Sequence, residues 1–388
     1  MGVAVTPRRA RVATVSVVVC SYTEARWERL VAAVRSLHHQ TMRPQQVLLV
    51  IDHCPELMSR AIKELSGVQV VANRHSPGLS GARNTGLESA TGEVVAFLDD
   101  DAVAARDWVE RLVARYGDPT VVGVGGFVRP DWAGGRPRWF PPEFDWVVGC
   151  SYTGLPRTSL PVRNFIGANM SFRRSLLLEL GGFRSELGRQ QANASGCEET
   201  ELCIRAQSAS EDAQLLYEPQ AEVVHHVPGS RATWTYFLTR CYAEGRSKAI
   251  VVRLTESSKA LASERSYLSR TIPRGMRSAL GSAARGRLAG SLQAIALLAG
   301  VLWTVAGYVV ATAKGRSLVA APVSQAVLPA AAGLVALAAT TAVAVQPAGL
   351  LAPGRTDVVP AGPALRPPPG RRSRPGPGSE QPAPTTES

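Results

Sequence analysis

Short apolar, β-branched runs alternate with helical patterns through the first third of the chain. The runs predict strands at 14–20, 46–52, 68–73, 93–99 and 121–128. Between them, apolar residues recur at helical spacing over about 24–40, 55–66, 80–90 and 105–116. Strands that are apolar along their whole length favour a mostly parallel sheet with helices on both faces, an α/β fold. Ligands of such sheets bind at the carboxyl ends of the strands.

The pattern is less regular from 129 to 230. A stretch rich in Pro, Gly and aromatic residues at 130–146 predicts a loop held by aromatic anchors. Further helices are expected at 174–180 and 198–209, and short strands at 214–217 and 222–226. From 231 to about 254 the pattern is that of an amphipathic helix, which lies either on a bilayer interface or on the surface of the domain.

The C-terminal region has the pattern of a membrane segment. Leu288 to Ala313 is a run of 26 uncharged residues, and about 20 suffice to cross a bilayer. A second apolar run at 318–346 follows, so we expect a hairpin of two spans in the cell membrane, with a soluble helical hairpin as the alternative. The arginine-rich flank at 270–287 predicts that the large N-terminal domain is cytoplasmic. The tail after 353, rich in Pro, Gly and Ser, is expected to be disordered.

Most of the net charge of +12 comes from basic residues next to that apolar region. Residues 12–264 hold 27 Lys and Arg against 28 Asp and Glu, whereas 265–316 hold eight basic residues and no acidic one. This distribution favours an anionic membrane surface as the partner and argues against nucleic acid. The six cysteines form no Cys-x-x-Cys pair, which argues against zinc, and the absence of a signal peptide pattern favours reduced thiols in the cytosol.

Three adjacent carboxylates end the strand at 93–99. In extended backbone, residues two apart point to the same side, so Asp99 and Asp101 share a side and Asp100 is the spacer between them. Two carboxylates on one side can hold Mg²⁺ or Mn²⁺ together with water and a substrate phosphate. The alternative is a solvated cap for the helix at 105–116.

Polar residues at other predicted strand and helix ends favour the ligand site. Asp52 ends a second strand, where it either accepts hydrogen bonds from a base or sugar or simply stabilises a turn. A Gly/Ser turn then leads into a helix with Arg83 and Asn84 in its first turns, an arrangement that suits a phosphate. No Gly-x-Gly-x-x-Gly follows the first strand, which argues against a dinucleotide-binding fold.

A second acidic group begins the helix at 198. Glu198 and Glu199 either complement the helix dipole or supply a general base. His225 lies at the end of a strand, where it is either structural or a metal ligand.

Six motifs in this order resemble a membrane-anchored bacterial family 2 glycosyltransferase. They are VSVVVCSYTE, VLLVID, GLSGARNTGLESATGEVVAFLDDDA, GANMSFRR followed by GGF, CEETEL and VVHH, within about residues 14–250. The resemblance implies the GT-A (nucleotide-diphospho-sugar transferase) fold, a Rossmann-like sheet. It also implies inverting transfer from a nucleotide-diphosphate sugar, with Mg²⁺ or Mn²⁺, to an acceptor hydroxyl. Membrane anchoring adds a glycan or polyprenyl-linked acceptor and membrane lipid as partners.

The resemblance also implies roles for single residues. Tyr22 and Glu24 match the loop that contacts the nucleotide, and Asp52 matches the carboxylate that reads the base. Arg83 matches a basic residue near the nucleotide, with Asn84 beside it. Asp99, Asp100 and Asp101 match the DXD motif, with Asp99 and Asp101 as its outer members and Asp101 on the metal. His225 matches a late histidine near the metal or diphosphate.

Two departures from the family pattern concern the base and the first loop. The base motif falls on Glu198 and Glu199, where Glu199 replaces the usual Asp; we favour Glu199 as the base, although the order of the two could be reversed. The loop after the first strand reads YTE and not YNR. A nucleotidyltransferase of similar fold and a non-catalytic membrane scaffold are the rival interpretations.

The expected segments follow from these assignments. They are a basic tail at 1–13, a nucleotide-sugar-binding half at 14–130, an acceptor-binding half at 131–265, a basic juxtamembrane segment at 266–287, spans at 288–313 and 318–346, and a tail at 353–388.

Overall fold

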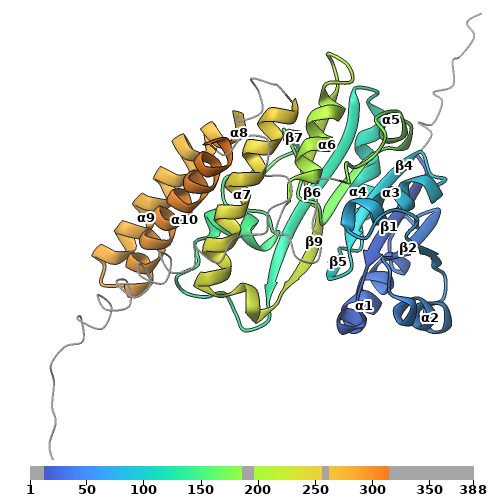
Figure 1. The fold of residues 1–388 in the computed structure, drawn as a ribbon, viewed down its shortest axis with the longest axis horizontal. Helices are drawn as coiled ribbons and strands as arrows, with labels where there is room; N and C mark the ends of the chain where they lie inside the picture. Colours follow the sequence, from blue (N-terminus) through green and yellow to red (C-terminus); the bar gives the residue numbers. More distant parts are fainter. Residues whose placement is uncertain (1–12, 186–195, 256–261, 314–388) are drawn as a thin grey trace, which may run out of the picture. The chain divides into compact units, whose positions relative to one another are not determined.

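A computed structural model describes residues 13–185, 196–255 and 262–313. Its centre is a nine-stranded sheet with the order β3-β2-β1-β4-β8-β6-β9-β5, and β7 pairs with β9 outside this path (Figure 1). Helices cover both faces of the sheet, as the sequence predicts.

The first half is parallel because each strand is followed by a helix that returns the chain. Its strands are β1 (Val15–Ser21), β2 (Gln46–Ile51), β3 (Gln69–Ala72) and β4 (Val94–Asp99). The helices between them are α1 (Trp27–His38), α2 (Pro55–Glu64) and α3 (Leu79–Ser89). Alternate residues of β1 serve the two faces: Val17 packs in the cluster with α1 and α2, and Val18 packs in the cluster with α3. The predicted strands and helices are confirmed here within a few residues.

The second half makes the sheet mixed. Strand β8 (Asn169–Arg173) enters antiparallel between β4 and β6 (Val121–Trp132), and the long β9 (Gln214–Val227) runs parallel to β6. The short β5 (Ala102–Ala104) and β7 (Leu160–Pro161) pair antiparallel with β9. The two short strands that the sequence predicts at 214–217 and 222–226 are therefore one strand, with a register shift opposite Gly126 and Val128.

Three short helices accompany this half of the sheet. They are α4 (Trp108–Val113), α5 (Arg174–Glu179) and α6 (Glu198–Gln207). Helix α4 continues as a 3₁₀ turn at Ala114–Gly117, so the helix expected at 105–116 is α-helical only in its middle.

The C-terminal helices pack beside the sheet. They are α7 (Trp234–Thr255), α8 (Ala262–Ser266), α9 (Ile272–Ala284) and α10 (Leu288–Ala313), with a π-helical turn at Tyr267–Thr271. Helix α10 packs along α7 and α9. Glycines permit this approach: a Cβ on Gly307 would lie 2.1 Å from the Tyr242 carbonyl oxygen, and one on Gly300 would lie 2.5 Å from the Phe144 ring. The amphipathic helix expected from 231 is therefore packed between the domain and α10.

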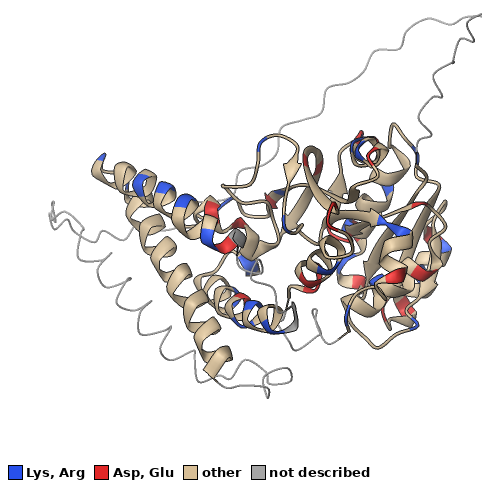
Figure 2. Ribbon diagram, turned by 90° about the horizontal axis from the view of Figure 1, so that it is seen from above, with Lys and Arg blue, Asp and Glu red and all other residues tan. Residues whose placement is uncertain are grey.

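Helix α10 is, within the described residues, the one helix long and apolar enough to cross a membrane. A third of its most apolar stretch is buried, and its outer face carries an exposed apolar row of Leu288, Ile295, Leu298, Leu302, Val305 and Val309. Lys and Arg, without Asp or Glu, follow one side of α9 next to it (Figure 2). The second apolar run at 318–346, the basic tail and the tail after 353 lie outside the described residues.

Candidate active site

The ends of β4 and β9 bring three predicted ligands together. Asp99 ends β4, Asp101 follows two residues later, and His225 pairs with Ala102 where β5 meets β9. One ligand atom from each of Asp99, Asp101 and His225 lies within 4.8 Å of the others. His225 Nε2 lies 3.2 Å from Asp101 Oδ1. Two carboxylates and an imidazole on one edge are a donor set that suits a divalent cation.

The Asp101 carboxylate is held in its ionised form. Burial alone would raise its pKa, but the hydrogen bond and charge of His225, together with the charges of Arg26 and Arg231, bring the pKa below its usual range. A carboxylate that stays ionised at neutral pH is the form that binds a metal ion.

Asp100 points away from this group and has partners of its own. Ser21 Oγ donates a hydrogen bond to it at 2.6 Å, and Arg26 Nη1 lies 3.0 Å from its other oxygen. Burial raises the pKa of Asp100 to about 6 against the opposing charge of Arg26. The residue that the sequence treats as a spacer therefore ties the end of β4 to β1.

Arg26 is a site residue that the sequence analysis missed. Its guanidinium contacts Asp100 at 3.0 Å and Asp101 at 3.3 Å, from the turn that follows β1. The available signal was a basic residue just after a strand whose carboxyl end neighbours three carboxylates. The Tyr22 ring lies beside Arg26, with 5.4 Å between the guanidinium carbon and the ring centroid, and is 47% exposed.

Arg83 connects the strand-end carboxylates to the second acidic group. It is buried, with Nη1 3.1 Å from Glu198 Oε1 and Nη2 3.4 Å from Asp99 Oδ1. Nη2 also donates to the Gly167 carbonyl at 3.1 Å. Burial disfavours its charge, but the charges of Asp99 and Glu198 outweigh this effect and raise its pKa.

Glu198 and Glu199 begin α6 after a residue in left-handed backbone, Cys197 with φ 79°. Glu198 is paired with Arg83 through one oxygen, and its buried Oε2 has no hydrogen-bond partner among the residues that the structure describes. Burial, and then the charge of Glu198, raises the pKa of Glu199 to about 8. The two neighbours thus differ in environment: one is neutralised by a cation, and the other has a high proton affinity.

Three residues that the sequence predicts to contact the nucleotide have partners within the protein. Asn84 exchanges two 2.8 Å hydrogen bonds with the backbone of Phe183, so its amide fixes the loop after α5 and is not free to face a nucleotide. Asp52 accepts from Asn73 Nδ2 at 2.6 Å and from the Gly78 amide at 2.8 Å, which anchors the turn before α3. Glu24 lies 3.9 Å from Arg60 on the surface.

A cavity of about 550 Å³ opens over this edge of the sheet. Arg83, Asp99, Glu198, Glu199 and His225 are among the residues that line it. Residues of α7, α8 and α10 also line it. Both acidic groups therefore face one space that can hold a substrate.

Comparison with known proteins agrees with this geometry. The family model described as "Glycosyl transferase family 2" matches residues 16–181. The glucosyl-dolichyl phosphate glucuronosyltransferase of Haloferax volcanii is 36% identical over 241 residues, which are 61% of this chain and 77% of the relative. The chain belongs to glycosyltransferase family 2.

Other similar proteins are more distant from this family 2 glycosyltransferase. Succinoglycan biosynthesis protein ExoM of Rhizobium meliloti is 28% identical over 238 residues, 59% of this chain and 72% of that protein. Among solved structures, a mannosyltransferase from Pyrobaculum calidifontis, in complex with GDP-Man and Mn²⁺, aligns with a TM-score of 0.47 and 20% identity over 85% of this chain and 81% of that one.

Proposed function

We propose that this glycosyltransferase moves a sugar, with inversion, from a nucleotide-diphosphate sugar to a hydroxyl of a lipid-linked or cell-envelope glycan acceptor. One observation carries the proposal. Asp99, Asp101 and His225 converge at one edge of the sheet, and Arg83 links that group to Glu198 beside Glu199. One buried guanidinium thus connects the proposed leaving-group site to Glu198, the neighbour of the proposed base.

Asp101, Asp99 and His225 would hold Mg²⁺ or Mn²⁺. Their oxygens and imidazole nitrogen lie close enough to share one ion, and the ionised Asp101 provides the negative charge that a hard cation requires. When bound, the ion supplies positive charge that neutralises the diphosphate leaving group.

Glu199 is the proposed general base. In inverting transfer the acceptor oxygen attacks C1 from the face opposite the diphosphate, and a carboxylate near that oxygen takes its proton. Glu198 is less suited because Arg83 neutralises it at 3.1 Å. Glu199 is not so paired, and its raised pKa gives it a stronger pull on the hydroxyl proton.

The segments after β1 and β2 are proposed to bind the nucleotide of the donor. Tyr22 and Arg26 lie after β1, and Asp52 directly follows β2, so all three lie at the carboxyl edge of the parallel strands, where we propose that the nucleotide binds. We assign Arg83 to positioning Asp99 and Glu198, and Arg26 to the charge balance around Asp101.

The acceptor is assigned from the membrane-like helix and from a relative. The name of the Haloferax volcanii relative specifies a glucosyl-dolichyl phosphate acceptor. In this chain the cavity reaches α10, the apolar helix, which suits an acceptor that carries a lipid. We therefore assign a sugar linked to a polyprenyl phosphate, with the catalytic domain on the cytoplasmic side of the membrane.

The test is a donor panel on the full chain in detergent micelles, with UDP-glucuronic acid, UDP-glucose and GDP-mannose as donors. Glucosyl polyprenyl phosphate is the acceptor, and nucleoside diphosphate release is measured with and without Mn²⁺. We expect release that requires one donor, the acceptor and the metal, with an inverted anomeric product. Diphosphate release from a nucleoside triphosphate would support a nucleotidyltransferase instead, and inertness to every donor would support a scaffold.

A further inference from the structure

A buried cysteine contacts the ring of His225 on a different edge from the one near Asp101. Cys150 Sγ lies 3.6 Å from His225 Nδ1. The other ring nitrogen, Nε2, lies 3.2 Å from Asp101 Oδ1. His225 lines the cavity, whereas Cys150 is fully buried. Cys150 therefore reaches the site through the imidazole and not by touching a substrate itself.

A tight turn fixes the position of Cys150. The turn follows the 3₁₀ segment η3 (Pro142–Val148) and contains Gly149 with φ 82°, a left-handed backbone that other residues rarely adopt. Directly after the cysteine, the Ser151 amide donates to the Val128 carbonyl at 2.8 Å. Val128 belongs to β6, which pairs with β9, the strand of the histidine. The sulfur and the ring are thus held by neighbouring parts of the sheet.

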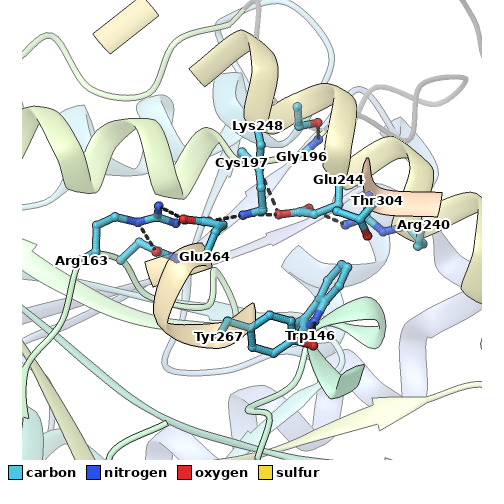
Figure 3. Close-up of polar contacts among 12 residues, drawn as sticks. Trp146, Arg163, Gly196, Cys197, Arg240, Glu244, Lys248, Glu264, Tyr267 and Thr304 are labelled. Carbon is cyan, nitrogen blue, oxygen red and sulfur yellow. Dashed lines mark hydrogen bonds and ion pairs between the residues drawn. The ribbon is translucent and has the colours of Figure 1, made fainter. Parts of the chain in front are cut away.

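The segment before the turn is anchored as well. Trp146 Nε1 donates to Tyr267 Oη at 3.2 Å (Figure 3). Tyr267 Oη in turn donates to the Glu143 carbonyl at 2.8 Å, and the Cys150 amide donates to the Asp145 carbonyl at 3.0 Å. The place of the sulfur is therefore set by contacts on both sides of it in the chain.

A thiol can partner either tautomer of the ring. A histidine ligates through Nε2 only when its ring proton is on Nδ1, and that N–H then needs an acceptor. The Cys150 sulfur can accept this hydrogen bond while its own S–H donates to the Val148 carbonyl oxygen, 3.9 Å away. When Nε2 carries the proton instead, it can donate to Asp101, and the S–H can donate to Nδ1.

The Val148 carbonyl can serve this thiol alongside its other donor. Arg231 Nη1 donates to the same oxygen at 3.5 Å. A carbonyl oxygen has two lone pairs, so both donors can be accommodated. A path of hydrogen bonds thus runs from the η3 backbone through the thiol to the imidazole.

We propose that Cys150 is a positioning residue that holds His225 with Nε2 toward the ion shared with Asp99 and Asp101, by accepting a hydrogen bond from Nδ1–H at its sulfur. This assignment rests on the proposed function, because it concerns the metal site proposed there. Groups that hydrogen-bond to a ligating histidine typically change metal affinity by about 10–100-fold. Sulfur is a weak acceptor, so we expect the lower end of this range, about 10-fold.

The alternative is that Cys150 only fills space. A buried cysteine behaves as a small apolar residue, and Cys150 belongs to the larger core cluster. A residue with this role alone would not change metal affinity by way of His225. The dependence of its effect on the imidazole therefore separates the two roles.

The Mn²⁺ affinity of the full chain in detergent tests the assignment, measured by electron paramagnetic resonance of the free ion. Cys150→Ala should weaken Mn²⁺ binding about 10-fold. In a His225→Ala background, the same replacement should change the affinity by less than about twofold, because the ring through which it acts is gone. Cys241→Ala removes another fully buried cysteine, on α7, and should leave the affinity unchanged.

Two further measurements separate binding from folding. Thermal unfolding of each variant shows that it is folded at the temperature of the titration. Cys150→Ser, a smaller change in volume, repeats the comparison in both backgrounds where Cys150→Ala does not fold. Electron spin echo modulation from an imidazole nitrogen should be present in the wild-type Mn²⁺ complex and lost in His225→Ala.

The remaining outcomes contradict either the role of Cys150 or the function. Wild-type affinity in Cys150→Ala would overturn the assignment, and so would an equal loss with and without His225, the sign of a packing role. A Mn²⁺ complex without the nitrogen signal would overturn the roles of His225 and Cys150 and leave the transferase function standing. Absence of Mn²⁺ binding in the wild type would overturn the metal site and this assignment with it. The readout is metal affinity, so a chain with every expected Mn²⁺ result but no sugar transfer would overturn the proposed function alone.

Discussion

Arg83 and Glu198 are 115 positions apart in the chain, yet their side chains form a buried ion pair at 3.1 Å. The pair joins α3, in the first half of the domain, to α6 in the second. Arg83 also lies 3.4 Å from Asp99. A single side chain therefore links the proposed metal ligands at the end of β4 to Glu198 at the start of α6.

Removal of Arg83 should therefore affect folding and catalysis together. Arg83→Gln leaves Glu198 and Asp99 without their cation, and breaking one partner of a buried pair typically costs about 3–5 kcal/mol. We expect transfer to fall at least about 100-fold and the thermal unfolding temperature to fall clearly. Arg83→Lys should recover little, because an ammonium group cannot bridge both carboxylates as a guanidinium does. Arg29→Gln, an exposed arginine on α1, is the matched control; equal behaviour of the two variants would exclude this role.

Replacement of Glu199 should remove activity and add stability. Its folded pKa of about 8 lies above the usual 4.5, so the folded state binds the proton more tightly. The stability linked to this group is complete below pH 4.5 and is lost as the pH rises toward 8. Glu199→Gln should thus raise the unfolding temperature at pH 8 and leave it unchanged near pH 4. It should also reduce transfer at least about 100-fold.

The pH profile of transfer gives a second measure of Glu199. The base must be unprotonated, so wild-type activity should rise with pH between 6 and 8. A profile that is flat in this range, or a Glu199→Gln variant with full turnover, would move the base to Glu198.

Replacement of Asp100 and replacement of Asp101 should affect metal binding differently. Asp101→Asn should abolish Mn²⁺ binding, measured by electron paramagnetic resonance of the free ion, and it should also lower stability, because His225 and Arg26 lose a buried, ionised partner. Asp100→Ala should leave Mn²⁺ binding measurable but cost about 1–3 kcal/mol of unfolding free energy, because Ser21 and Arg26 lose a buried partner. The sequence favours Asp100 as the mildest position of the three; the contacts of Asp100 predict that this holds for metal binding and not for stability.

The arginines beside α10 should sense anionic lipid. Arg270, Arg274 and Arg277 are exposed, and their spacing places them on one side of consecutive helical turns. Replacing all three by Gln should reduce the preference for vesicles with phosphatidylglycerol over neutral vesicles by about 100-fold, at about 1 kcal/mol for each charge. Arg29, Arg35 and Arg43, exposed on the other half of the domain, provide the matched triple variant. An equal loss from both triple variants would indicate a general charge effect only.

The strand ends could be predicted from the sequence because local rules decide them. Apolar β-branched runs define β1, β2 and β4, so the chemistry at Asp52 and Asp99 is placed by strand length alone. The pairing of β8 between β4 and β6 depends on contacts distant in sequence, and no local pattern encodes it. The contacts of Arg26 with Asp100 and Asp101 also join residues distant in sequence, so no local pattern predicted them.

The site residues divide in the same way. Asp99, Asp101 and His225 could be chosen by residue type and position, and the structure brings them together. Asn84 has the right type and position for a ligand contact, but its amide is used by the Phe183 backbone, a partner 99 positions away. The ion pairs of Glu264 with Arg163 and Lys248 were not predictable, because these residues come from α8, the segment after β7 and α7.

The glycine contacts of α10 have a consequence for how the protein is made. Gly300 rests on the Phe144 and Phe237 rings, and Gly307 rests on the Tyr242 backbone, so one side of α7 is covered by α10. The aromatic cluster under α10 stays open until the segment with Gly300 and Gly307 has left the ribosome. Maturation of the acceptor side of the enzyme is therefore coupled to the emergence of its most apolar segment, and a nascent chain that has not reached this point has no completed acceptor cavity.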